Sequence, residues 1–177
     1  PKNIENIKKE FLYKVYTQKW FILCDQIKQK YNQEQRKISP TAQKKEATTF
    51  ATRFTYDTNR IEGSTLSLKE TANLLERGIT PSAKPLDDIK ETEAHKAVFE
   101  SMLEYKKDLS LQIILYWHKQ LFTATKFDIS GKIRTHQVAI SGSKFLPPSP
   151  VEVYPALQDF LNWYRKEQNH LHPIELA

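Results

Sequence analysis

Histidines are the residues of this chain best suited to acid–base or metal chemistry, and their positions limit what they can do. His170 and His172 are one residue apart and could bind a metal together. They lie at a predicted junction between a loop and a helix, directly before Pro173, so the start of a helix explains them better. His95 and His118 fall in predicted helices, where we expect partly buried polar residues rather than bases.

Nucleophiles and phosphate-binding loops give no clearer signal. Ser141 and Ser143 form no recognisable nucleophile arrangement with the histidines. A single cysteine, Cys24, excludes an intramolecular disulfide and a cysteine-based zinc site. The chain has four glycines, and none of them are spaced as in the glycine-rich loops that bind dinucleotides or triphosphates. These patterns alone therefore predict a fold but no activity.

The charge is concentrated at the start of the chain. The net charge is +6, and residues 1–50 hold 11 basic and 5 acidic side chains, which accounts for all of the excess. The lysines are scattered and lack an interleaved aromatic stripe, so we interpret them as a solvated helix face and do not predict nucleic-acid binding. No apolar run approaches the roughly 20 residues that cross a bilayer, and the N-terminus has no apolar signal core. We expect a cytoplasmic protein without a membrane partner.

The apolar spacing predicts a mainly α-helical fold in a chain long enough for one domain. Ser67 and Glu70 form a capping box before one helix, which Gly78 is placed to end, and Gly63 is placed to end the helix before it. We expect helices over residues 3–32, 40–62, 68–77, 87–106 and 150–166, another that is capped at Asp108 or Ser110 and carries the inward-facing residues Leu111 to Leu121, and one from 173 onward.

The periodicity changes once, between residues 134 and 146. Arg134 to Ile140 has the composition of a strand, Ser141 to Ser143 that of a turn, and Lys144 to Leu146 can return before Pro147. This stretch predicts the one β-hairpin of the chain. The sequence then stops one turn into an apolar helix, which is too short to repay helix nucleation. We therefore expect a piece of a longer protein.

One motif goes further than the element pattern. Residues Thr58–Gly63 read T-N-R-I-E-G and match [ST]-x-x-x-E-[GN] at the end of a predicted helix. The segment resembles the inhibitory motif of Fic domain proteins (the Fido superfamily). Later landmarks of that family follow in the same order: Gly131–Arg134, Val138–Gly142, Pro147–Pro148, Trp163 and His172–Pro173. The resemblance covers about residues 45–177, so we expect a basic N-terminal helical segment over 1–44 and the first part of a Fic-like domain over 45–177.

The resemblance implies an activity for the parent protein. Fic enzymes typically transfer AMP from ATP to a Ser, Thr or Tyr hydroxyl of a target protein, with Mg²⁺ as the metal. Their signature, H-x-F-x-[DE]-G-N-G-R-x-x-R, does not occur in these 177 residues. We therefore expect no catalytic or metal-binding residue in this chain and no transferase activity from it alone.

The resemblance also implies that Glu62 is an inhibitory glutamate, with Thr58 and Gly63 as the rest of the motif. In the family this carboxylate pairs with an arginine of the signature that otherwise binds the ATP γ-phosphate. The inhibition would act in cis, without a partner protein that supplies the glutamate. The alternative is an ordinary exposed carboxylate at a helix end.

The predicted hairpin resembles the family's flap. Val138, Ala139 and Ile140 would dock the target through main-chain hydrogen bonds. Together with Glu62, the residues expected near the nucleotide are Ile140, Ser141, Gly142, Ser143 and Lys144. The alternative is a purely structural hairpin.

Two other functions stay open. The parent could remove AMP or move another phosphate-containing group, or the chain could be a non-catalytic helical module for binding or dimerisation. A homodimer is frequent among members of the family and is expected here on that ground alone.

Overall fold

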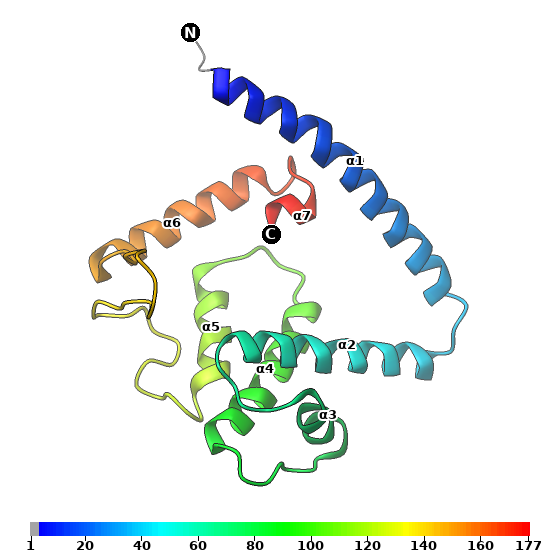
Figure 1. Cartoon of the computed structure of the whole chain (residues 1–177), viewed down its shortest axis with the longest axis vertical. Coiled ribbons are helices and arrows are strands. Elements are labelled where there is room, and N and C mark those ends of the chain that lie inside the picture. Colours follow the sequence, from blue (N-terminus) through cyan, green and yellow to red (C-terminus); the bar gives the residue numbers. More distant parts are fainter. Residues whose placement is uncertain (1–3) are drawn as a thin grey trace. The chain divides into compact units, whose positions relative to one another are not determined.

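The structure is a computed structural model that describes residues 4–177, with side chains described from Lys19 onward. Helices account for all of the regular structure in this described part, and no residue of it lies in a strand (Figure 1). The helices are α1 (Ile4–Gln35), α2 (Pro40–Ile61), α3 (Leu68–Arg77), α4 (Leu86–Glu104), α5 (Leu111–Phe122), α6 (Pro150–Glu167) and α7 (Pro173–Leu176). The predicted helices are confirmed, with ends that differ by a few residues.

The chain forms two compact units. Unit 1 comprises the described residues up to Lys45 together with Lys166–Ala177, and unit 2 is the continuous stretch Glu46–Arg165. The boundary that we expect between residues 44 and 45 separates a basic segment from a Fic-like domain, and it remains a prediction. None of the helices in the described part combines the length and apolar character that crossing a bilayer requires.

Unit 1 joins two segments that are far apart in sequence. The imidazole of His172 stacks on the ring of Phe21, with centroids 4.2 Å apart, and its Nε2 lies 3.4 Å from Oδ1 of Asp25. The Nδ1 of His172 accepts a hydrogen bond from the backbone N–H of Ile174, so this histidine caps α7. The interpretation of His172 as a helix-start residue is confirmed.

The core of unit 2 is small and lies where α3 and α4 pack against each other. Leu66, Leu74 and Ile89 are buried together, with Leu75 packed beside them. Helix α4 also packs along α5. Helix α3 begins with the predicted capping box, in which the Ser67 hydroxyl and the Glu70 carboxylate each bind the other's backbone N–H. Burial of these apolar side chains fixes the turn between α2 and α3.

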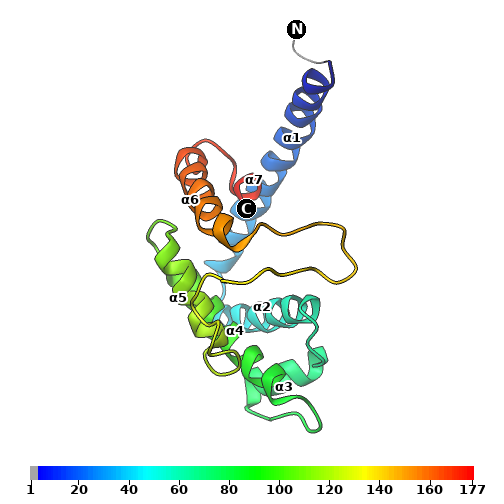
Figure 2. The ribbon, with the colours of Figure 1, turned by 90° about the vertical axis from the view of Figure 1, so that its left-hand side faces the viewer.

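The predicted β-hairpin over residues 134–146 is wrong. This segment runs out and back as an open loop between α5 and α6 (Figure 2), and its two limbs form no ladder. Ile140, Phe145 and Leu146 are 53%, 64% and 75% exposed, so neither limb buries a face against the protein. A two-stranded hairpin without such a face is marginal in water, which explains why strand-like composition does not produce strands here.

Side chains hold the base of the loop instead. Arg134 donates from Nη1 to the carbonyl of His136 at 3.0 Å and from Nη2 to the carbonyl of Pro148. Gln137 donates from Nε2 to the carbonyl of Pro147 at 3.0 Å. These bonds join the two limbs of the loop near its ends and leave the tip, residues 138–144, without ladder partners.

Candidate functional site

Glu62 lies at the C-terminal cap of α2, where a reversal of the chain ends the helix. Gly63 adopts a left-handed backbone, with φ at 95°. The N–H of Ser64 donates to the carbonyl of Asn59 at 2.9 Å, and the N–H of Gly63 donates to the carbonyl of Arg60 at 3.2 Å. These two bonds are the Schellman pattern, which favours glycine at the residue that follows the cap. The Thr58–Gly63 motif therefore encodes its own helix end.

The charge of Glu62 is poorly placed for helix stability. The C-terminus of a helix carries a partial negative charge, so a carboxylate there is unfavourable. Among the side chains that the structure describes, none forms a hydrogen bond or ion pair with the Glu62 carboxylate. Glu62 is exposed, so its placement agrees with both sequence-based interpretations, an ordinary carboxylate at a helix end and an inhibitory glutamate whose partner lies elsewhere.

A shallow hollow of about 210 Å³ lies beside Glu62. Its lining residues are Asn59, Glu62, Gly63, Ser64, Asp87, Asp88, Glu91 and Lys126. Lys126 supplies the cation of this lining, and its Nζ already lies 2.8 Å from Oε1 of Glu91, which also accepts a hydrogen bond from the Thr125 hydroxyl at 2.7 Å. The carboxylates therefore outnumber the available positive charge, and the hollow favours a cation over a phosphate.

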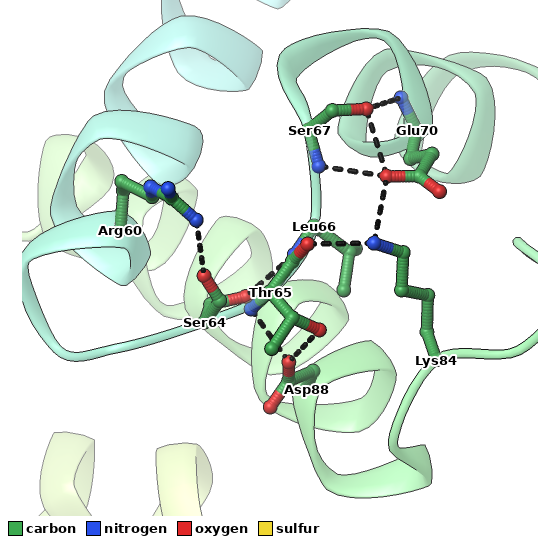
Figure 3. Close-up of polar contacts among 8 residues, drawn as sticks. All are labelled: Arg60, Ser64, Thr65, Leu66, Ser67, Glu70, Lys84 and Asp88. Carbon is green, nitrogen blue, oxygen red and sulfur yellow. Dashed lines mark hydrogen bonds and ion pairs between the residues drawn. The ribbon is translucent and has the colours of Figure 1, made fainter.

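The turn that follows Glu62 is held by side chains from three directions (Figure 3). Asp88 Oδ2 accepts hydrogen bonds from the backbone N–H and from the hydroxyl of Thr65, both at 2.7 Å. Lys84 Nζ donates to the carbonyl of Thr65 at 2.7 Å. Arg60 Nη1 donates to the carbonyl of Ser64 at 3.2 Å. Side chains rather than helix or sheet pairing therefore satisfy both the backbone N–H and the carbonyl of Thr65.

The capping box closes this turn on its far side. Glu70 Oε2 accepts hydrogen bonds from the backbone and the hydroxyl of Ser67, at 2.8 and 2.7 Å. It also lies 3.4 Å from Lys84 Nζ. The hydrogen bonds from the Ser67 backbone and side chain, followed by the lysine, lower the pKa of the Glu70 carboxyl. Glu70 therefore stays ionised and keeps the start of α3 capped.

Two polar contacts hold α2 against α4. The Thr55 hydroxyl lies 3.0 Å from His95 Nδ1, and Asn59 Nδ2 donates to the Thr92 hydroxyl at 3.1 Å. Burial lowers the pKa of the His95 imidazole, which confirms the expectation of a partly buried helix residue. The position of Glu62 thus depends on a fixed register between the two helices.

The loop residues lie apart from this hollow. Its lining contains none of residues 138–144. Val138 instead lines a separate hollow of about 320 Å³, together with His118 and Arg134. Ile140 and residues 141–144 are exposed at the tip of the loop. The structure brings Glu62 and Gly63 together, places half-buried Thr58 one turn earlier on α2, and leaves the predicted nucleotide and docking residues of the loop in another place.

His118 fixes the start of this loop. Its Nδ1 accepts a hydrogen bond from the backbone N–H of Gly131 at 2.9 Å, and burial lowers the pKa of its imidazole. The neutral ring that this contact requires is therefore favoured, and His118 acts here as a structural acceptor.

Sequence reasoning missed Asp88 and Lys84. Asp87 and Asp88 lie in the first turn of α4, where acidic residues are common because of the helix dipole. The sequence therefore gives no separate sign that Asp88 contacts Thr65, 23 residues earlier in the chain. Lys84 lies in a loop and carries no local signal. Only packing of α3 on α4 brings both side chains to the turn after Glu62.

The described residues offer no metal site. No group of three or more His, Cys, Asp or Glu side chains in the described part is arranged to hold an ion. The acidic hollow beside Glu62 does not suit a triphosphate.

Comparison with known proteins identifies the fold and part of the sequence. Residues 108–177 match the model of the Fic/DOC family. The chain is 32% identical over 130 residues to protein adenylyltransferase fic-1 of Caenorhabditis elegans, covering 70% of this chain and 25% of that protein. It is 30% identical over 127 residues to protein adenylyltransferase Fic of Drosophila grimshawi, covering 69% and 26%. The alignments thus span about a quarter of the length of these curated relatives.

Solved structures extend the likeness to the whole chain. A Fic domain containing signaling protein from Bacteroides thetaiotaomicron matches with a TM-score of 0.73 and 25% identity, covering 85% of this chain and 60% of that one. Fic-1 from C. elegans matches with a TM-score of 0.75 and 25% identity, covering 99% of this chain and 53% of that one. The second match includes α2 and its Glu62 cap. Residues 108–177 therefore belong to the Fic/DOC family, and the chain has the fold of part of a Fic protein.

Proposed function

We propose that this chain is part of a protein adenylyltransferase that inhibits itself through Glu62. The curated relatives named above carry that activity in their names, which supports it at the level of the family. In the reaction, a hydroxyl oxygen of the target attacks the α-phosphorus of ATP. The bond from that phosphorus to the bridging oxygen breaks, pyrophosphate leaves, and the hydroxyl proton passes to a base outside these 177 residues.

The observation that carries the inhibitory role is the Glu62 carboxylate itself. It lies at the C-terminal end of α2, where the helix dipole disfavours a negative charge. It lacks a partner among the described side chains, and the hollow beside it is acidic. A guanidinium would relieve all three of these unfavourable features at once. An arginine held there is withdrawn from the γ-phosphate of ATP, and the surrounding carboxylates repel the triphosphate.

ATP would bind to parts of the protein other than the hollow described here, because the carboxylates of the hollow repel a triphosphate. Mg²⁺ would accompany the nucleotide. The contribution of this chain is regulation and target docking. The loop tip at Val138, Ala139 and Ile140 forms no ladder. The carbonyls of Val138 and Ile140 accept hydrogen bonds within the loop, from Gln137 Nε2 and from the N–H of Ser143. Pairing with an extended segment of a target protein would use the other main-chain groups of the tip or replace these bonds. Residues Ser141 to Lys144 would lie at the end of that pairing.

The test is AMP transfer by the whole protein that contains this chain, with radiolabelled ATP and Mg²⁺. We expect Glu62→Gly to raise the transfer rate at least about tenfold, the change that corresponds to one lost ion pair of about 1.4 kcal/mol. Asp57→Asn is the matched control, because Asp57 lies on the same helix and its charge is already paired with Arg53 at 2.8 Å. Equal rates for the Glu62→Gly protein and the unchanged protein would exclude an inhibitory Glu62.

A further inference from the structure

Asp88 makes two short contacts with the turn that follows Glu62. One oxygen of its carboxylate, Oδ2, accepts both the N–H and the hydroxyl of Thr65, each at 2.7 Å. Figure 3 shows the carboxylate reaching this turn from α4. Hydrogen bonds to an ionised carboxylate are about twice as strong as neutral ones. The pair therefore ties the residues after Glu62 to the rigid body of α4.

We propose that Asp88 is a positioning residue for inhibition, which holds the Glu62 carboxylate in place by fixing the turn at Thr65. This inference rests on the proposed inhibitory role of Glu62. Only Gly63 and Ser64 lie between Glu62 and Thr65, and Gly63 has a permissive backbone. Without an anchor at Thr65, the last turn of α2 can fray and carry the carboxylate away.

The other contacts of the turn do not replace Asp88. Lys84 and Arg60 both bind carbonyl groups, of Thr65 and Ser64 respectively. Within the described residues, the N–H of Thr65 donates to Asp88. Loss of Asp88 leaves this donor to water, and the turn loses the bond that connects it to α4.

Asp88 also adds negative charge to the hollow, so its electrostatic effect on Glu62 must be separated from its positioning of the turn. Removing its charge would lower the repulsion that Glu62 experiences and would favour the inhibitory position. Asp88→Asn removes the charge and keeps an oxygen that can accept from Thr65. Asp88→Ala removes both. Positioning therefore predicts a large effect of alanine and a small effect of asparagine, whereas charge alone predicts equal effects.

The first measurement is amide hydrogen exchange of the 177-residue chain, followed by NMR at Thr65. We expect Asp88→Ala to accelerate exchange of this amide about tenfold, the loss of one charge-assisted hydrogen bond, and Asp88→Asn to accelerate it much less. Asp87→Ala is the matched control, since it removes the same charge from the same helix turn and has no hydrogen bond to residues 64–67. Unchanged exchange in Asp88→Ala would overturn the inference.

The second measurement is AMP transfer by the whole protein in a double-mutant cycle with Glu62→Gly. We expect Asp88→Ala to raise transfer about threefold to tenfold when Glu62 is present, as expected for coupling through a neighbouring element. It should add nothing when Glu62 is absent. A merely structural role would instead lower transfer in both backgrounds.

The outcomes separate the two proposals. If Glu62→Gly raises transfer and Asp88→Ala does not, the positioning role is overturned and the inhibitory role of Glu62 stands. If Glu62→Gly has no effect, both are overturned. If Asp88→Ala raises transfer equally with and without Glu62, Asp88 does not act through Glu62 and the inference fails.

Discussion

Gly131 is the position at which a single added carbon should disturb the fold most clearly. Its backbone is left-handed, with φ at 70°. A Cβ at this residue would lie 2.8 Å from Cβ of Lys119 and 3.3 Å from the carbonyl oxygen of Leu115. Both of these atoms are fixed by α5, so neither can move aside without bending the helix. We expect Gly131→Ala to destabilise unit 2 strongly.

The magnitude has two parts. A left-handed backbone costs a residue with a Cβ about 1–2 kcal/mol. Forcing a carbon into a closely packed site costs about 1–3 kcal/mol more. The free energy of unfolding should therefore fall by about 2–5 kcal/mol, a large share of the 5–15 kcal/mol that is typical of a domain.

Gly142→Ala is the control that isolates the steric part. Gly142 has nearly the same backbone, with φ at 74°, but nothing lies within 4 Å of its Cβ position. We expect it to lose only the about 1–2 kcal/mol of the left-handed backbone. The assay is urea unfolding of the 177-residue chain, followed by circular dichroism at fixed pH. If both variants lose the same free energy, α5 does not press on Gly131 and this account of the loop's start is wrong.

Four further substitutions test other parts of the structure by the same unfolding assay. Glu62→Gln should raise the free energy of unfolding by about 0.5 kcal/mol, because it removes a charge from the unfavourable end of α2; a decrease would reveal a stabilising partner. Thr52→Val should raise it by about 1 kcal/mol, because the hydroxyl of this residue is buried without a partner, whereas Thr55→Val should lower it by removing the contact with His95; similar effects of the two would contradict the assignment. Burial lowers the pKa of His95 in the folded chain, so the unfolded chain binds more protons than the folded chain in acid. The contribution of a neutral His95 to the free energy of unfolding should therefore be complete above about pH 6.5 and decrease as the pH falls below that value. His95→Gln should flatten this dependence and Thr55→Val should keep it, as measured between pH 5 and pH 7.5.

The helices could be predicted because their ends are encoded locally. Ser67 and Glu70 cap α3 with contacts only three residues apart. Gly63 and Gly78 end α2 and α3 through a backbone conformation that other residues adopt at a cost. Such signals need no knowledge of the rest of the fold.

The loop could not be predicted in the same way. The strand-like composition of residues 134–140 is a local preference, but a ladder needs a surface to cover, and the exposure of Ile140 and Phe145 shows that none is provided here. The bonds from Arg134 and Gln137 that close the loop connect residues 14 and 10 positions apart. Their partners are backbone carbonyls, which any sequence supplies.

The candidate site was predicted in part. The motif predicts Glu62 and Gly63 because it is local and lies at a helix end, and their inhibitory role stays a prediction. The contact of Asp88 with Thr65 joins residues 23 positions apart, and it exists only because α3 packs on α4. No spacing rule connects these two residues, so the anchor of the turn becomes visible only in three dimensions.

The composition of the two units has a consequence for the order in which the chain can fold. Unit 2 is one uninterrupted stretch, whereas unit 1 pairs the region of Phe21 with the region of His172. During synthesis, the last residue of unit 2 leaves the ribosome before His172, the stacking partner of Phe21, does. Unit 2 can therefore acquire its structure first, and α1 must wait for the C-terminal residues that complete its own unit.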